Sequence, residues 1–310
     1  MSTIEKALEK QRQLAEKLRQ KEADAAARAS TQMHPLEPPA PPSPPTVEVA
    51  PHPAEPIKTE ANEQPSSGLD KPVIEIDVER LDELGFVTPT ERFSKIKEEY
   101  RYIKRPLLNN AFGATASTLR NPNLIMVSSS FSGEGKTFTA VNLAISMALE
   151  QDRNVLLIDA DVVHPHVCER LGIEERPGLL DFLRGNLEVT DIIYDTSIPK
   201  LKLVTAGTRH HHASEMLASE KMKRLMTELS TRYSDRVVIF DTSPLLGASE
   251  TNVLSQNAGQ AVVVVEQGRT THQQLEQALR LLNPEIATNL ILNKSNAGRS
   301  EYYGYYYANN

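Results

Sequence analysis

The chain has little of several features that define common protein classes. Among its 310 residues there is no tryptophan and one cysteine, Cys168. A single cysteine excludes a disulfide within the chain, which agrees with a reducing compartment. No apolar run approaches the ~20 residues of a membrane span, and the charged N-terminus MSTIEKALEKQ lacks the apolar segment of a secretion signal. We therefore expect a soluble, cytoplasmic protein that reaches a membrane only peripherally, through a partner.

An excess of positive charge is also missing. The formal net charge is −7, whereas binding to nucleic acid needs clustered Lys and Arg, so nucleic acid is not an expected partner. Hydrophobic residues make up 39% of the chain, below the ~45–50% usual for a packed protein. Part of the chain is therefore not expected to join a core.

Two segments without a packed core are expected before residue 73. In residues 1–29, Ile4, Leu8 and Leu18 lie at helical spacing, which predicts an amphipathic helix, either solvated or docked in a coiled coil. Residues 30–72 hold 12 of the 20 prolines. Because proline fixes φ and removes a backbone donor, this segment is expected to be a disordered, extended linker.

A regular alternation of apolar and amphipathic stretches follows. Residues 73–122 form a pre-domain segment, with a helix in TERFSKIKEEYRYIKRPLL expected to stop before Pro106. Over residues 123–298, six apolar runs alternate with amphipathic stretches; the runs are NLIMVSS, VLLIDA, LKLVTAG, RVVIFD, AVVVVE and NLILNK. This pattern predicts an α/β domain with a doubly wound, mostly parallel sheet covered on both faces.

A phosphate-binding loop is expected after the first strand. Residues 130–137 read SFSGEGKT, which matches the P-loop G-x-x-x-x-G-K-[ST] except for Ser130 in place of the first glycine. Gly133 and Gly135 would let backbone N–H groups close around phosphate oxygens. Lys136 would supply positive charge, and the Thr137 hydroxyl suits a Mg²⁺ ligand. The alternative is a Gly/Ser turn before a helix.

Carboxylates follow two further strands. In VLLIDADVVHP, Asp159 and Asp161 come where the expected strand ends, and in RVVIFDTSP the strand ends at Asp241. Ligands of parallel sheets bind at the carboxyl ends of the strands, and carboxylates there commonly organise Mg²⁺. One such aspartate often only caps the next helix, but three beside a P-loop favour a nucleotide site.

The P-loop, the D-x-D and hhhhD-x-x-P motifs and the terminal SEYYGYYYANN resemble the bacterial tyrosine kinases, most of all the cytoplasmic autokinases associated with exopolysaccharide export and exosortase systems. The likeness covers residues 93–310. It implies a P-loop NTPase fold and ATP and Mg²⁺ as cofactors. It also implies an autokinase that phosphorylates tyrosines between subunits and regulates exopolysaccharide synthesis or export.

The resemblance also implies residue roles. Catalysis would use Lys136, Asp159 and Asp161, with Asp159 orienting or deprotonating the tyrosine hydroxyl, because a free phenol has a pKa of about 10. Mg²⁺ would be held by Thr137, Asp161 and Asp241. The nucleotide would contact Ser132, Gly133, Glu134, Gly135, Lys136, Thr137, Phe138 and Asn293. The phosphorylated residues, in the tail 299–310, would be Tyr302, Tyr303, Tyr305, Tyr306 and Tyr307.

Partners are implied in the same way. The family carries E-x-x-R-x-x-R at a ring-forming interface, and this chain has Glu98, Arg101 and Lys104, whose spacing of three predicts one helical face; a solvated charged face is the alternative. The implied partners are further copies of the chain, a separate membrane-spanning chain-length-determinant adaptor and a tyrosine phosphatase.

Val163 replaces a frequent arginine of the family, so a basic contact from that loop is in doubt, and His164 is expected at the surface.

Two other functions compete with the kinase. A MinD/ParA-like switch ATPase shares the fold, but its K-G-G-x-G-K-[ST] loop has lysine where this chain has Phe131. An ATP-dependent assembly scaffold for a membrane polysaccharide complex is the third interpretation. Detection of phosphotyrosine distinguishes the kinase from both.

Overall fold

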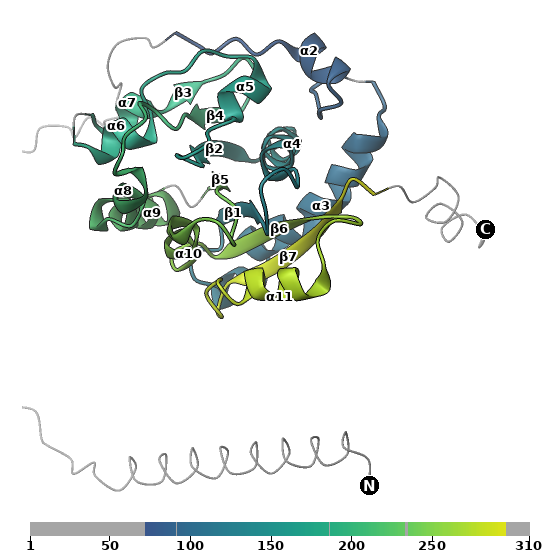
Figure 1. Ribbon diagram of the computed structural model, residues 1–310. Coiled ribbons are helices and arrows are strands. Elements are labelled where there is room, and N and C mark those ends of the chain that lie inside the picture. Colours follow the sequence, from purple (N-terminus) through teal and green to yellow (C-terminus); the bar gives the residue numbers. More distant parts are fainter. Residues whose placement is uncertain (1–71, 91, 186, 233–234, 296–310) are drawn as a thin grey trace, which may run out of the picture. The chain divides into compact units, whose positions relative to one another are not determined.

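The computed structural model describes residues 72–295, apart from positions 91, 186, 233 and 234 (Figure 1). The expected N-terminal helix 1–29, nearly all of the linker 30–72 and the tail 299–310 lie outside these residues. Within the described part of the chain, no helix is both long enough and apolar enough to cross a membrane.

One sheet of seven strands runs through the structure in the order β3-β4-β2-β5-β1-β6-β7. All neighbours are parallel except β3 and β4. The bounds are β1 Leu124–Ser129, β2 Asn154–Ala160, β3 Tyr194–Asp195, β4 Leu201–Val204, β5 Arg236–Thr242, β6 Gln260–Glu266 and β7 Ala287–Asn293. The predicted sheet is therefore confirmed, and β3 is an addition too short to show a periodic pattern.

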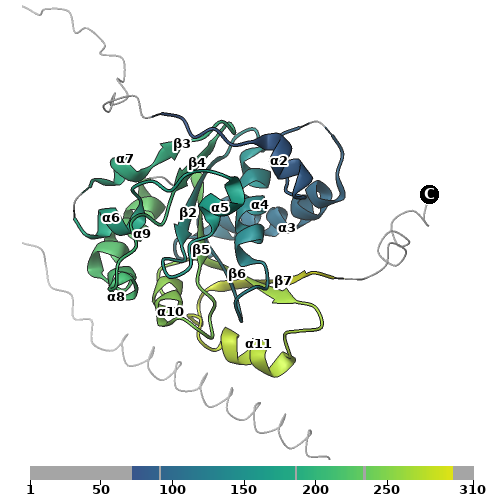
Figure 2. The ribbon, with the colours of Figure 1, turned by 45° about the horizontal axis from the view of Figure 1, so that its top comes forward.

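Helices cover both faces of this sheet (Figure 2). Successive residues of a strand point to opposite faces, so Ile125 and Val127 of β1 join one core while Leu124 and Met126 join the other. The first core includes α2 Val78–Glu83, α3 Lys95–Phe112, α4 Lys136–Ala148 and α5 Val167–Leu171. The second includes α6 Leu179–Leu183, α7 Val189–Ile192, α8 Ala213–Leu217, α9 Glu220–Thr231, α10 Ser249–Ser255 and α11 His272–Leu279. A short 3₁₀ turn, η1 Ala116–Thr118, follows α3.

Two helices differ from the prediction. The expectation that the helix stops before Pro106 is wrong, because α3 continues to Phe112 with Pro106 inside it. Proline removes one helical hydrogen bond, and the burial of Leu107 and Ala111 beyond it stabilises the continuation. The amphipathic stretch 213–233 is two helices, because the Ser219 hydroxyl accepts a hydrogen bond from the Met222 amide and begins α9.

The strand order brings the expected functional segments together. β1, which leads into the P-loop, lies beside β5, and β5 lies beside β2. Asp159 at the end of β2 is the direct register partner of Asp241 at the end of β5. Residues separated by more than 80 positions therefore meet at one edge of the sheet.

Candidate active site

The P-loop joins β1 to α4 through two glycines with positive φ. Gly133 has φ 87° and Gly135 has φ 102°, values that side chains with a Cβ rarely adopt. A Cβ on Gly135 would also collide with the Asn293 side chain. Gly135 is the N-terminal cap of α4, so Lys136 and Thr137 form its first turn. Unpaired amides of this turn and the helix dipole favour an anion here.

Glu134 holds the loop from within. Its side chain is buried, and its carboxylate accepts hydrogen bonds from the Phe131 amide, at 2.9 Å, and from the Thr270 hydroxyl. Thr270 lies between β6 and α11. The Glu134 side chain therefore fixes the loop shape, a role that the motif alone did not indicate.

The end of β7 supports the same loop. Asn293 Nδ2 donates to the Glu134 carbonyl at 2.8 Å, and Lys294 Nζ donates to the Gly133 carbonyl at 2.8 Å. Asn293 thus lies at the P-loop, where its amide contacts loop backbone. Ser132 is exposed, whereas the half-buried Phe138 packs on Phe86 with ring centroids 4.7 Å apart.

A buried ion pair lies behind the loop. Lys136 Nζ is 2.6 Å from Asp161 Oδ2 and 3.9 Å from Asp241 Oδ1. Burial works to lower the pKa of Lys136, but the charges of Asp241 and Asp161 outweigh it and raise that pKa. Asp161 Oδ1 also accepts from the Ser243 hydroxyl at 2.7 Å and from the His164 amide at 3.2 Å. The Asp161 side chain is therefore fixed on both sides.

Asp159 is buried beside this pair. Its carboxylate accepts from the Asp161 amide at 3.2 Å and from the Val167 amide at 3.0 Å. Burial, followed by the charge of Asp241, raises the pKa of Asp159 well above its usual value, although the Val167 amide opposes the shift. A carboxylate with a raised pKa is a better proton acceptor.

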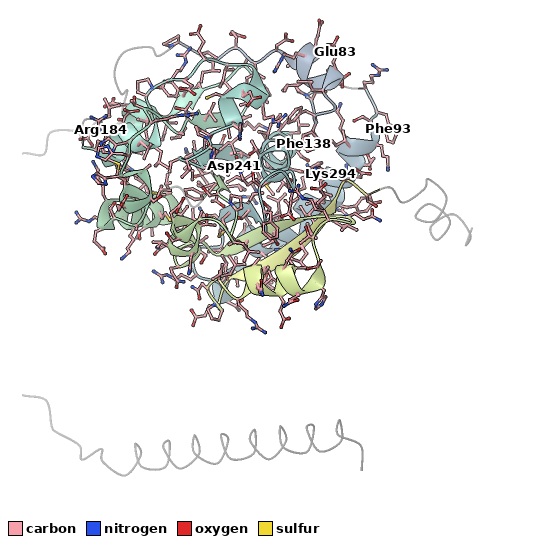
Figure 3. The ribbon with its side chains drawn as sticks, in the orientation of Figure 1. Glu83, Phe93, Phe138, Arg184, Asp241 and Lys294 are labelled. Carbon is pink, nitrogen blue, oxygen red and sulfur yellow. The ribbon has the colours of Figure 1, made fainter. Side chains whose placement is uncertain are left out.

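Asp241 provides a test of whether this cluster suits a cation. It is fully buried, and neither carboxylate oxygen has a hydrogen-bond partner at normal distance within the described residues. Burial raises its pKa to about 6 against the opposing effects of Lys136 and Thr137. Buried carboxylate oxygens without donors are suitable ligands for Mg²⁺, so Asp241 with Asp161 and Thr137 fits the ion. Figure 3 labels Asp241 in the interior, with Lys294 toward the edge of the molecule.

The expected interface triad is only partly formed. Arg101 Nη1 pairs with Glu98 Oε1 at 2.9 Å. Lys104 is turned away from this pair: it is buried, and its Nζ is 2.6 Å from both Glu150 Oε1 and the Ser146 carbonyl. The reason is helical phase, because Lys104 lies three residues before Leu107 on the face of α3 that enters the core. The role of the three residues in a contact between copies stays a prediction.

Other sequence expectations can be placed directly. Val163 is 44% exposed, and His164 lies at the surface as predicted. The five candidate acceptor tyrosines lie outside the described residues, so their phosphorylation stays a prediction.

A cavity of about 320 Å³ adjoins Asp159. Its walls come from the end of β2, the start of α5 and the segments around 173–175 and 205–209; they are Asp159, Pro165, His166, Cys168, Glu169, Ile173, Glu175, Thr205, Ala206, Gly207 and Arg209. No motif in the sequence indicates this cavity, because its lining residues come from separate segments.

Known proteins resemble this chain in sequence and in fold. A family model described as "AAA domain" matches residues 123–293, more than half of the chain. The tyrosine-protein kinase YwqD of Bacillus subtilis is 32% identical over 222 residues, which cover 71% of this chain and 90% of YwqD. The chain belongs to the bacterial tyrosine kinase family.

Other bacterial tyrosine kinases match over part of their length. The chain is 32% identical to the tyrosine-protein kinase ptk of Acinetobacter johnsonii over 56% of its own length, but spans only 23% of ptk. The crystal structure of the VpsO kinase domain is 27% identical, with a TM-score of 0.55, covering 64% of this chain and 96% of that domain. The kinase domain of Escherichia coli ETK, at 24% identity and a TM-score of 0.56, covers 73% of this chain and 92% of that domain and shares the fold.

Proposed function

We propose that this member of the family is an ATP-dependent protein-tyrosine autokinase that uses Mg²⁺. The observation that carries the proposal is the buried cluster of Lys136, Asp161, Asp241 and Asp159 directly behind the P-loop. The relatives' names, tyrosine-protein kinases, favour this function over a switch ATPase or a scaffold.

The chain's own residues divide the work of phosphate binding. The P-loop amides and Lys136 bind the phosphates. Thr137, Asp161 and Asp241 would hold Mg²⁺, which when bound neutralises charge on the phosphate oxygens. Glu134 and Asn293 keep the loop in its phosphate-binding shape through the hydrogen bonds described above.

Asp159 would handle the proton of the acceptor. The phenol oxygen attacks the γ-phosphorus, the bond from that phosphorus to the β–γ bridging oxygen breaks, and ADP leaves. The phenol proton passes to Asp159 and then to solvent. The raised pKa of Asp159 brings its proton affinity closer to that of the phenol.

The proposed acceptors are Tyr302, Tyr303, Tyr305, Tyr306 and Tyr307 of a neighbouring copy. Each phosphate adds about −1.5 to −2 charge, so a modified tail would be repelled by the acidic site and loosen a ring of copies. Glu98 and Arg101 remain candidates for the contact between copies. A membrane-spanning chain-length-determinant adaptor, a tyrosine phosphatase and the regulation of exopolysaccharide export complete the proposal.

Mass spectrometry tests this function. Purified protein incubated with Mg-ATP should gain phosphate within residues 302–307, and Lys136→Met and Asp159→Asn should not. Hydrolysis of ATP without phosphotyrosine, even with a membrane adaptor present, would support the switch ATPase instead.

A further inference from the structure

The outer edge of β7 presents backbone donors and acceptors to its surroundings. β7 is an end strand of the sheet (Figure 1), and among the described residues β6 is the only strand that pairs with it. The Ala287 amide donates to the Gly259 carbonyl at 3.0 Å, on the β6 side. Because the backbone groups of successive strand residues point to opposite sides, those of the alternate residues point outward. These outward residues are Thr288, Leu290 and Leu292.

The same residues expose apolar side chains. Leu290 is 53% and Leu292 is 59% exposed, whereas Ile291 between them packs against the first core. The strand ATNLILN contains no charged residue and no proline, the residues with which proteins commonly prevent pairing at an edge. β7 therefore combines an open backbone edge with apolar side chains, the features that allow a further strand to be added.

The opposite edge of the sheet shows how this chain covers a strand. β3 has only two residues. The segment before α2 lies along it, with the Ile74 amide donating to the Asp195 carbonyl at 2.8 Å and the Ser197 amide donating to the Ile74 carbonyl at 2.9 Å. Residues from elsewhere in the chain thus protect that edge, whereas the described residues provide β7 with no such cover.

We propose that β7 binds the tail of its own chain, and that residues 302–307 form an additional antiparallel strand on the open edge. This segment, YYGYYY, contains five tyrosines, a residue type enriched in strands. Like β7 itself, it carries no charge before modification. The docking does not depend on the proposed kinase function, and only its consequence for phosphorylation does.

The spacing of the tyrosines fits the exposed side chains of β7. Alternate residues of a strand share a face, so three tyrosines, here called the docking-face tyrosines, would lie together with Gly304 on the other face. With Tyr305 opposite Leu290, an antiparallel register places each of the three on an outward residue of β7. The resulting pairs are Tyr303–Leu292, Tyr305–Leu290 and Tyr307–Thr288. Cross-strand pairs that contain an aromatic ring stabilise a sheet, and these would remove apolar surface from water.

The chain geometry at the end of β7 favours its own tail. Lys294 has φ 54°, a left-handed conformation that ends the direction of the strand, and the following Asn296 and Gly298 are common in turns. Short connections such as 294–301 join antiparallel strands, whereas parallel strands need a crossover of about a dozen residues or more. A short connection also costs little closure entropy, so the tail of the same chain is favoured over that of a second copy.

Docking would control which form of the tail is available for phosphorylation. The docking-face tyrosines would contact apolar side chains, where a phosphate with about −1.5 to −2 charge would lose part of its hydration. β7 would therefore hold the unmodified tail and release the phosphorylated one. While the tail is paired with β7 it does not extend toward another copy, so docking slows the first phosphorylation.

Hydrogen exchange tests the docking in the full chain without nucleotide. The docking-face variant carries Tyr303→Ser, Tyr305→Ser and Tyr307→Ser, and the matched control carries Tyr302→Ser and Tyr306→Ser. In the docking-face variant, the amides of Leu290 and Leu292 should exchange at least ~10-fold faster than in wild type, and in the control their rates should change little. Equal rates in wild type and the docking-face variant would overturn the proposal, and an equal increase in the control would contradict the assigned face.

Disulfide trapping distinguishes the chain's own tail from that of a second copy. With Cys168→Ser to remove the native thiol, Leu290→Cys and Tyr305→Cys should form a disulfide within one chain, because residues paired across antiparallel strands are ~5.5 Å apart at Cα. Tyr306→Cys in place of Tyr305→Cys is the control, and its disulfide should form several-fold more slowly. A disulfide found only between chains would assign the edge to a second copy and contradict the proposal, as would equal rates for the two tail positions.

Phosphorylation measures the consequence of docking. Leu290→Glu places a charge on the open edge and should raise the initial rate of tail phosphorylation several-fold. Leu84→Glu changes another leucine that is 52% exposed and should leave this rate unchanged. An unchanged rate in Leu290→Glu would contradict the control of phosphorylation by docking. If no variant incorporates phosphate, the kinase proposal fails, while exchange and trapping still decide whether the tail docks on β7.

Discussion

Two groups of charged side chains flank the P-loop, and they differ in exposure. Toward β2 and β5, the residues Lys136, Asp159, Asp161 and Asp241 are at most 6% exposed. Toward β6 and β7, Glu266 pairs with Arg269 and Lys294 at 3.0 Å each, and the two basic side chains are 53% and 48% exposed. The same chemical groups thus meet very different solvent environments within one site.

The difference in exposure suggests different roles, with the reaction assigned to the buried group and support of the loop to the exposed group. Buried charges carry a large desolvation cost, so burial of three carboxylates around one lysine is a poor way to stabilise a fold. Their burial fits the proposed binding of phosphate, a cation and a proton at this site. The exposed group has a small desolvation cost and contributes little to stability. It supports the loop through Lys294.

The largest effect should follow from removing the buried lysine. Lys136→Met should lower the rate of tyrosine phosphorylation by at least ~10³-fold, because phosphate charge loses its partner. It also leaves Asp161 and Asp241 without a positively charged partner, which costs roughly 3–5 kcal/mol where the carboxylates stay ionised. Lys294→Met on the exposed side is the control. Similar losses of activity in both variants, measured by phosphotyrosine formation, would remove the distinction between the two groups.

The next largest effect on the rate is expected from Asp159→Asn. Loss of a proton acceptor lowers kcat by about 10²–10⁴-fold, with little change in KM for the acceptor. Because the pKa of Asp159 is raised, wild-type kcat should increase with pH through a range above that of an ordinary aspartate. The asparagine variant should lack this increase. A pH profile with the same acidic limb in both proteins would assign the limb to another group.

Asp241→Asn should change stability with pH. The pKa of Asp241 is raised to about 6 in the folded chain, so the folded state holds this proton more tightly than the unfolded state does. The contribution of Asp241 to the free energy of unfolding therefore falls as pH rises from about 4 to about 6. At pH 8, without Mg²⁺, we expect the variant to be more stable by roughly 3 kcal/mol.

Chemical denaturation at pH 4 and pH 8 measures this difference. Mg²⁺ should stabilise the wild type at pH 8 and have a smaller effect on Asp241→Asn. A variant less stable than wild type at pH 8 without Mg²⁺ would mean that groups inside the protein already stabilise the ionised Asp241 carboxylate.

The smallest effect is expected on the exposed side. Glu266→Gln removes two ion pairs whose basic partners are open to solvent, so the free energy of unfolding should fall by less than ~1 kcal/mol. Thermal unfolding at low and at high salt checks this, since screening should reduce the difference further. A loss of several kcal/mol would show that these pairs act like the buried cluster.

The fold and the core of the site were readable from local patterns. Continuous apolar runs predicted the strands, and the P-loop spacing with Asp159, Asp161 and Asp241 predicted one charged edge, because parallel strands share the position of their carboxyl ends. The structure places all of these residues together. Their position in the fold could be predicted from the order of residues within each segment alone.

Other features depend on pairs that the sequence does not link. Nothing near Glu134 indicates that Thr270 will meet it. Lys104 matched a spacing, but its place on α3 is decided by the buried neighbour Leu107. The continuation of α3 past Pro106 likewise depends on tertiary packing, which outweighs the local preference of proline.

The position of Cys168 has an experimental consequence. The chain has a single thiol, and it forms part of the cavity wall beside Asp159. With a pKa of about 12 it reacts slowly at neutral pH, and its place in the wall makes the rate of alkylation depend on whether the cavity is covered. In the unmutated protein, one mass increment on one residue would therefore record, molecule by molecule, whether this cavity is open or covered.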